Sequence, residues 1–307
     1  MQIRGTLIAD TFAEAFAMTA SRVIVSAESR EWAQIAGQVA SGYASSVIGC
    51  DCEAGIEREL TREETPDGFP GVSLLFFGFS RDALEKAITN RVAQSILTCP
   101  TTACYNGLPI RVGEEKRAIS IGGQLRYFGD GYQISKQIKM GADSKRFWRI
   151  PVMDGEFICE DRFGTTKGIG GGNFLILGKS RAATLAAATR SVQAIRRLPG
   201  VLLPFPGGIV RSGSKVGSRY RKLKASTNEA YCPTLKGLVP SALPDEVNAI
   251  YELVLDALDQ ATMKEAMKMG IVAACGEDIV QISAGNYGGK LGPFHFHLRD
   301  ICAGLES

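Results

Sequence analysis

One local pattern occurs four times along the chain and constrains the fold more than any other feature. An apolar run with strand character is followed by a Ser or Asp, an amphipathic helical stretch and usually a second short apolar run. Ser and Asp side chains can accept a hydrogen bond from the free amides of a first helical turn, so each marks a helix start. The expected helix-start residues are Ser29, Ser80, Ser180 and Asp259.

The four units form two pairs, and each pair predicts one lobe. The first apolar runs are residues 21–27, 71–78, 172–178 and 247–258. Two strand-helix-strand units side by side make a ferredoxin-like, or split βαβ, sandwich. The sequence therefore predicts an α+β fold of two ferredoxin-like lobes, residues 1–155 and 156–307. Runs at 45–50, 201–205 and 278–283 are expected to supply second strands, and 119–128, 147–153 and 155–159 further strands.

Composition indicates a soluble globular protein. No apolar run reaches the roughly 18 residues that a membrane helix needs, and the N-terminus lacks the basic-then-apolar order of a signal peptide. A cytoplasmic location is therefore expected. The eight cysteines include no CxxC pair, and Cys50-Cys52 is a poor zinc spacing, so we expect free thiols and no metal site.

Charge is unevenly distributed. Residues 162–228 contain thirteen Lys and Arg and no Asp or Glu, whereas the rest of the chain has a net charge of −10. Such a stretch can bind a polyanionic ligand, dock an acidic surface, or simply face water and salt. Aromatic residues are sparse there and no RNP-like string is present, so nucleic-acid binding is disfavoured.

Glycine clusters fall at strand ends and between units. They are FGDGYQ (128–133), GIGGGNF (168–174), PFPGGIV (204–210) and SAGNYGGKLG (283–292). Gly289-Lys290 is followed by Leu291, so the last is no phosphate loop, and none has the dinucleotide fingerprint. Tight turns can explain each cluster alone. Together they favour a pocket lined by backbone, and the polar segment 225–234 can recognise a polar ring or form a turn.

Glu252 is an acid inside an apolar strand, in IYELVL. Alternation places Ile250, Glu252 and Val254 on one face. Such a carboxyl is either exposed at an edge or held in a pocket, where a raised pKa lets it donate a proton at neutral pH. The only two histidines, His295 and His297, share one strand face with no third ligand nearby. A hydrolase triad would have to recruit one of these two, so such a mechanism is disfavoured but not excluded.

Several long strings in order resemble formylmethanofuran–tetrahydromethanopterin formyltransferases. They include DTFAEAFAMTASRVIVSA, EETPDGFPGV, FGDGYQ, GEFICEDRFG, PFPGGIV, ASTNEAYCPT, IYELV and ISAGNYGGKLG. The resemblance covers nearly the whole chain and is weaker over 101–120, 211–224 and 301–307. It implies two ferredoxin-like lobes, dimers or dimers of dimers, substrate clefts at a subunit interface, and neither a metal nor a covalent enzyme intermediate.

The resemblance implies site residues as well. The family's important carboxylate belongs to a Tyr-Glu pair, which here is Tyr251-Glu252, so Glu252 is the expected catalytic residue. Cleft segments matching the family imply substrate contacts at Asp130, Tyr132, Gln133, Asn173, Phe205, Pro206, Gly207, Gly208, Ser226, Thr227, Asn228, Tyr231, Asn286, Tyr287 and Lys290.

The resemblance implies formyl transfer between a methanofuran-type carrier and the ring nitrogen of tetrahydromethanopterin, through a tetrahedral intermediate, in formaldehyde oxidation. Either a protonated Glu252 or glycine-loop amides can stabilise the intermediate's oxygen. The basic stretch 162–228 can hold a polyglutamyl carrier tail or dock subunits similar to formylmethanofuran dehydrogenase, and both explanations stay open. The alternatives are a non-catalytic or assembly-dependent subunit of a formyltransferase/hydrolase complex, and hydrolysis with water replacing the pterin.

Overall fold

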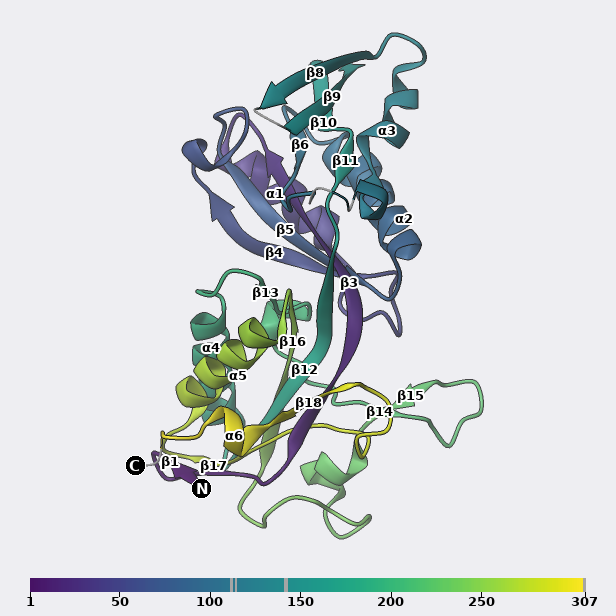
Figure 1. Cartoon of the computed structure of the whole chain (residues 1–307). Helices are drawn as coiled ribbons and strands as arrows, with labels where there is room; N and C mark the ends of the chain where they lie inside the picture. Colours follow the sequence, from purple (N-terminus) through teal and green to yellow (C-terminus); the bar gives the residue numbers. More distant parts are fainter. Residues whose placement is uncertain (111–112, 114, 141–142, 306–307) are drawn as a thin grey trace. The chain divides into compact units, whose positions relative to one another are not determined.

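The computed structural model describes residues 1–110, 113, 115–140 and 143–305, and the chain forms two compact units (Figure 1). The N-terminal unit is Ala17–Gly168, and the C-terminal unit combines Met1–Phe16 with Ile169–Ser307. Two long strands, β3 (Phe12–Ser26) and β12 (Thr166–Gly178), each contribute residues to both units. The first residues of the chain thus pack with its C-terminal half.

The N-terminal unit is built on a ferredoxin-like sandwich. After β3 its elements are α1 (Arg30–Ser41), β4 (Glu53–Leu60), β5 (Gly71–Gly78), α2 (Arg81–Arg91), the π-helical turn η2 (Val92–Ile96) and β6 (Ala103–Asn106). The strands lie in the order β4-β5-β3-β6, and all three pairings are antiparallel. This is the split βαβ order, so the predicted fold is confirmed for this unit.

The predicted second strand of the first unit was wrong in position. Residues 45–50 form turns, and the strand is β4, Glu53–Leu60, with the sequence EAGIEREL. β4 pairs with β5 at the edge of the four-strand order. An edge strand can place polar side chains in water, so its apolar signal is weak. A short apolar run nearby therefore gave a misleading strand signal.

Further strands extend this sheet beyond β6. Strand β10 runs parallel to β6, β9 is antiparallel to β10, and β8 is antiparallel to β9. The strand predicted over 119–128 was mostly wrong, because only its first two residues are extended. Gly122 lies so near Glu160 that an added Cβ would come within 2.4 Å of the Glu160 carbonyl oxygen, and this close approach seats a helical turn on β10. The elements are β7 (Ile119–Ser120), α3 (Gly122–Leu125), η4 (Arg126–Gly129), β8 (Ile134–Met140), β9 (Asp143–Val152), β10 (Gly155–Glu160) and β11 (Arg162–Phe163).

The C-terminal unit repeats the same topology. Its strand order is β13-β16-β12-β17 with antiparallel pairings, which confirms the second predicted ferredoxin-like lobe. β2 adds to β17, and β18 adds to the start of β3. The elements are β1 (Gln2–Ile3), β2 (Thr6–Ile8), β12, α4 (Arg181–Ile195), β13 (Val201–Leu202), β14 (Lys215–Val216), β15 (Ala225–Ser226), β16 (Ala249–Ala257), α5 (Gln260–Ala274), β17 (Ile279–Ser283), β18 (Phe294–His297) and α6 (Leu298–Ile301).

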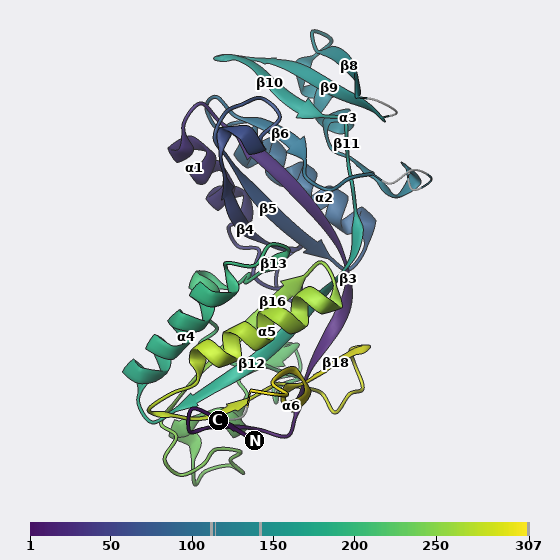
Figure 2. The same cartoon turned by 60° about the vertical axis from the view of Figure 1, so that its left-hand side comes forward.

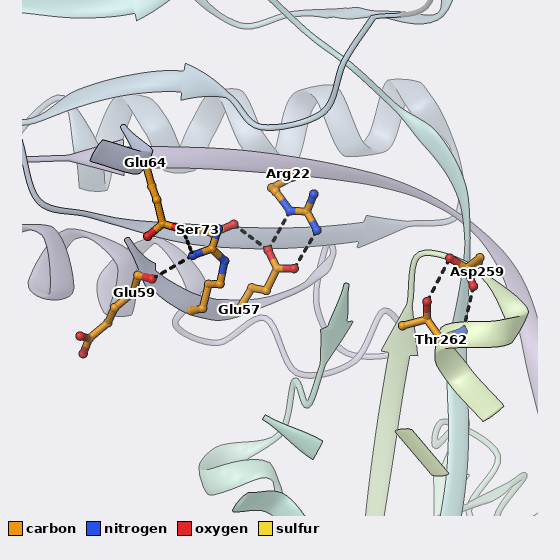
Figure 3. Close-up of polar contacts among 8 residues, drawn as sticks. Arg22, Glu57, Glu59, Glu64, Ser73, Asp259 and Thr262 are labelled. Carbon is orange, nitrogen blue, oxygen red and sulfur yellow. Dashed lines mark hydrogen bonds and ion pairs between the residues drawn. The ribbon is translucent and has the colours of Figure 1, made fainter. Parts of the chain in front are cut away.

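All four predicted helix caps are confirmed. The side chains of Ser29, Ser80, Ser180 and Asp259 each accept a hydrogen bond from the backbone amide three residues later. Figure 3 shows Asp259 bound to Thr262 at the start of α5. A cap of this kind is typically worth about 1 kcal/mol, so local sequence alone defines where these helices begin.

Helices α4 and α5 lie on one face of the sheet in the C-terminal unit (Figure 2). The inner face of α5 is fully buried at Met263, Met267 and Ile271, as its apolar spacing predicted. These side chains pack on Leu253 and Leu255 of β16 in one core cluster. The opposite face of β16 is therefore left free to line a cavity.

A partly buried polar cluster links β3, β4 and β5 in the N-terminal unit (Figure 3). Both carboxylate oxygens of Glu57 accept hydrogen bonds from Arg22, at 2.7 Å each, and one accepts a third from Ser73 at 2.6 Å. Bidentate pairing of this kind offsets the cost of burying the two charges.

No helix in the described part of the chain has the length and apolar character needed to cross a membrane.

Candidate active site

A cavity of about 410 Å³ opens on the side of β12 and β16 that faces away from α4 and α5. Its floor is formed by side chains of the two strands, and its walls by three irregular segments of the same C-terminal unit. The lining residues are Asn173, Leu175, 210–215, Asn228, 231–234, Ile250, Glu252 and 285–287.

Strand pairing fixes the backbone of Glu252 on both sides. It lies opposite Leu175 of β12. On its other side its backbone exchanges two hydrogen bonds with Val210, at 2.7 and 3.0 Å. Ile250 and Glu252 line the cavity while Leu253 is buried in the core, so the predicted alternation along this strand is confirmed.

The Glu252 carboxyl has unusual electrostatics. Burial raises its pKa to about 7, because the charged form loses contact with water. Among the described residues, no side chain or backbone amide is placed to hydrogen-bond or ion-pair with this carboxylate. Lys215 lines the same cavity but pairs with Glu229 instead. A half-neutral carboxyl facing a cavity can both donate and accept a proton near pH 7.

The segment 285–292, which is most of the predicted glycine cluster 283–292, is bound internally. Asn173 accepts from the Gly285 amide at 2.6 Å and donates to the Gly285 carbonyl at 3.1 Å. Asn286 accepts from the Gly288 amide and donates to the Phe12 carbonyl. Glu14 accepts four more amide hydrogen bonds from this segment. Most of these amides therefore already have partners inside the protein.

Six predicted site residues meet at this cavity. They come from β12, β16, the 228–231 segment and the 285–287 segment, which are far apart in the sequence. They are Asn173, Asn228, Tyr231, Glu252, Asn286 and Tyr287.

The remaining predicted residues fall into two groups. The first group belongs to the C-terminal unit but is not among the lining residues. It consists of Phe205, the three residues of the turn η5 (Pro206–Gly208), Ser226 of β15, Thr227 and Lys290. Gly207 and Gly208 both have positive φ, so this turn needs glycine to lead the chain into Val210. Asp130, Tyr132 and Gln133 follow η4 in the N-terminal unit.

Sequence reasoning named no individual site residue in the lining segment 211–215. This segment has no regular periodicity and lies where the family resemblance is weakest. The signal that pointed to it was the excess of basic residues, because Arg211 and Lys215 both line the cavity. The hairpin β14-β15 follows, and its tip exposes the side chains of Arg219, Arg221, Lys222 and Lys224. Residues 232–234 also line the cavity and belong to the polar segment 225–234 that the sequence indicated.

Comparison with known families decides the relationship. Residues 1–152 match the model for formylmethanofuran-tetrahydromethanopterin formyltransferase, and residues 155–301 match the model for its proximal lobe. The chain belongs to this formyltransferase family. The resemblance inferred from the sequence motifs is thereby confirmed over almost the full length.

Individual formyltransferases support the same assignment. The Methylococcus capsulatus enzyme is 54% identical over 99% of this chain and 100% of its own length. A Methylorubrum extorquens relative, named as one of the subunits of a formyltransferase/hydrolase complex, is 50% identical over 97% of this chain and 96% of its own. Bacterial members of the family are thus similar to this chain over nearly its whole length.

Solved formyltransferase structures share the fold. A chain of the Methylorubrum extorquens formyltransferase/hydrolase complex with methylofuran matches with a TM-score of 0.94, at 48% identity, over 100% of this chain and 99% of that one. The Methanosarcina barkeri formyltransferase matches with a TM-score of 0.89, at 43% identity, over 98% of this chain and 100% of that one.

Within the described residues, no group of three or more His, Cys, Asp or Glu side chains is arranged to hold a metal.

Proposed function

We propose that this chain transfers a formyl group between a methanofuran-type carrier and the ring nitrogen of tetrahydromethanopterin, with Glu252 as the acid. The family and its named relatives supply the reaction. One observation supports this role for Glu252: its carboxyl faces the cavity without a partner among the described residues, and burial raises its pKa to about 7. That pKa keeps about half of the carboxyl protonated at neutral pH.

The reaction requires the protein to stabilise a negatively charged oxygen and to protonate the departing amine. When the pterin nitrogen attacks the formyl carbon, the carbonyl oxygen gains negative charge, and a protonated Glu252 can donate a hydrogen bond to it. When the tetrahedral adduct collapses, the furan carrier's amine must gain a proton before it leaves. The same carboxyl can supply that proton and regain one from the pterin nitrogen, which loses its own proton as it becomes the formyl amide, so protons balance over the reaction.

The glycine loop is a poor alternative oxyanion site. Six of the eight backbone amides in residues 285–292, those of Gly285 and residues 287, 288, 289, 291 and 292, already donate to protein side chains. Donors engaged in this way cannot also serve a substrate without losing buried hydrogen bonds. The structural observations therefore favour Glu252 over the loop amides as the stabilising group.

Larger assembly belongs to the same proposal. We propose that the chain works as a homodimer or tetramer, or beside subunits similar to formylmethanofuran dehydrogenase, in the cytoplasm. A relative carries the name of a complex subunit, which supports the second arrangement. All eight cysteines are free, as suits a reducing compartment.

We further propose that the exposed β14-β15 tip binds an acidic carrier tail. If so, the paired change Arg221→Gln with Lys222→Gln should raise KM for a furan carrier with a glutamyl tail by about tenfold at low salt, leave kcat unchanged and flatten the salt dependence. The matched control removes two charges from α5, by Lys264→Gln with Lys268→Gln. Equal KM values for tailed and tail-free carriers would contradict tail binding, and loss of subunit association instead would identify a docking surface.

Formyl transfer by the purified wild-type chain tests the central proposal. We expect transfer from a formylated furan carrier to tetrahydromethanopterin, followed by ultraviolet absorbance, with no release of formate when the pterin is omitted. Formate release without pterin would indicate hydrolysis. Activity that appears only after partner subunits are added would favour the assembly-dependent alternative.

A further inference from the structure

Glu14 is a buried carboxylate with an unusual set of partners. It lies on β3, and only 1% of its surface is exposed. One oxygen accepts hydrogen bonds from the amides of Tyr287 and Gly289, at 2.7 and 2.9 Å. The other accepts from Leu291 and Gly292, at 2.5 and 2.6 Å. The segment 285–292 is therefore folded around a single side chain that precedes it by more than 270 residues.

The charge of Glu14 is what makes this arrangement stable. Burial alone would raise the pKa of the carboxyl, but the four amide hydrogen bonds outweigh it and lower the pKa to about 2. The side chain is therefore a full anion at every physiological pH. Hydrogen bonds to an ionised acceptor are about twice as strong as neutral ones. Only an acceptor with two charged oxygens can satisfy four convergent amides in this space.

Two asparagines complete the attachment of this segment. Asn173 binds both the amide and the carbonyl of Gly285, where the segment begins. Asn286 donates to the Thr11 hydroxyl and to the Phe12 carbonyl at the start of β3. The segment is thus held at its first two residues by neutral amide side chains and along the rest of its length by Glu14.

The position of this segment matters for Glu252. Gly285, Asn286 and Tyr287 form one wall of the cavity that Glu252 faces. Tyr287 lines this cavity together with Glu252, and its backbone amide donates to Glu14. Burial and the negative charges of these two carboxylates raise the pKa of its phenol. Desolvation of Glu252 therefore depends on this wall staying closed, and Glu14 holds the wall without touching the cavity.

We propose that Glu14 is a positioning residue: it locks the segment 285–292 into the cavity wall, which shields the Glu252 carboxyl from water and keeps Tyr287 beside it. This inference rests on formyl transfer at the same cavity. Glu14 lines no part of the cavity and touches no reacting atom. Its effect on the reaction passes through the segment it binds.

Glu14→Gln is the direct test, because it keeps the volume and removes the charge. The new amide NH2 would face two backbone donors, so the segment should open. We expect amide hydrogen exchange in the peptide 285–292 to become about a hundredfold faster or more. The matched control is Glu57→Gln, which removes a buried carboxylate that accepts hydrogen bonds from Arg22 and Ser73 in the N-terminal unit. It should leave exchange in this peptide unchanged.

The pH profile separates positioning from general stabilisation. Opening the wall lets water reach Glu252, so its pKa should fall toward the ordinary range and the basic limb of the kcat profile should move down by about one pH unit. At pH 7 we expect a loss of about fivefold, largely recovered at pH 5.5, where Glu252 is again protonated. The other titratable or charged groups facing the cavity are Arg211, Lys215, Tyr231, Cys232 and Tyr287.

Each outcome bears on the proposal. A folded Glu14→Gln protein with fast exchange but a wild-type kcat profile would overturn it, because Glu14 would then only stabilise the fold. If that variant does not fold, Asn286→Ala removes a smaller attachment of the same segment and should give the same shift in milder form. Wild-type kcat and profile in that variant, despite faster exchange, would also overturn it. An inactive wild type contradicts the proposed function instead, and is recognised by intact exchange protection of 285–292.

Discussion

Glu252→Gln is expected to lower kcat for formyl transfer by about a hundredfold or more at pH 6.5. Removing one donor that stabilises a developing oxyanion typically costs 10²–10³ in kcat, and the variant also loses the proton needed by the departing amine. Gln keeps the size and a weak donor, so KM for both carriers should change little. Steady-state absorbance measurements with saturating carriers would give kcat, and single-turnover measurements would give the rate constant of the chemical step without interference from product release.

The stability of the same variant serves as its control. In the wild type the pKa of Glu252 rises from 4.5 unfolded to about 7 folded. Below pH 4.5 the carboxyl is protonated in both the folded and the unfolded protein, so it does not change the free energy of unfolding. Between pH 4.5 and 7 it ionises only in the unfolded protein, so the free energy of unfolding of the wild type falls as pH rises. Glu252→Gln should therefore be more stable than the wild type at pH 8, by roughly 3 kcal/mol.

The combination of the two readouts is diagnostic. A variant that is inactive yet more stable at pH 8 has lost chemistry and not structure. Near-normal turnover would instead make Glu252 a structural residue and return the oxyanion role to other donors. Lower stability at pH 8 would show that the carboxylate has a favourable partner in solution.

The parts of the fold that the sequence predicts are those determined locally. Ser180 and Asp259 are followed directly by the amides that they cap, and the apolar spacing of α5 needs only its own residues to indicate a buried face. β4 was misplaced because the signal for an edge strand lies in its pairing with β5 and not in its composition. Gly122 needs the neighbouring β10 to explain its helical turn.

The site follows the same rule. Glu252 could be found because an acid inside an apolar strand is anomalous by itself, and the family resemblance then gave it a role. Glu14 lies near the N-terminus in FAEAFA, where one acid has no local meaning, since its four donors come from the opposite end of the chain. Segment 211–215 lines the cavity through irregular backbone, for which sequence has no periodic signal.

The rate of formyl transfer from the furan carrier to the pterin should fall as pH rises through about 7. The protonated form of Glu252 is the one that donates to the oxyanion, and its fraction is one half at a pKa of about 7. Each further unit of pH removes about tenfold of that form, so kcat at pH 9 should be about a hundredfold below its value at pH 6. A kcat profile over pH 5.5–9.5 at saturating carrier concentrations measures this directly.

Two features make the profile specific to Glu252. Bound carriers displace water from the cavity and strengthen desolvation, so the midpoint for kcat should lie at or above the midpoint for kcat/KM, which reports the free enzyme. In Glu252→Gln the fall in kcat around pH 7 should disappear, because the group whose ionisation lowers kcat has been removed. A wild-type profile that is flat or rises between pH 6 and 9 would mean that the ionised carboxylate is the active form. Glu252 would then act as a base on the attacking pterin nitrogen.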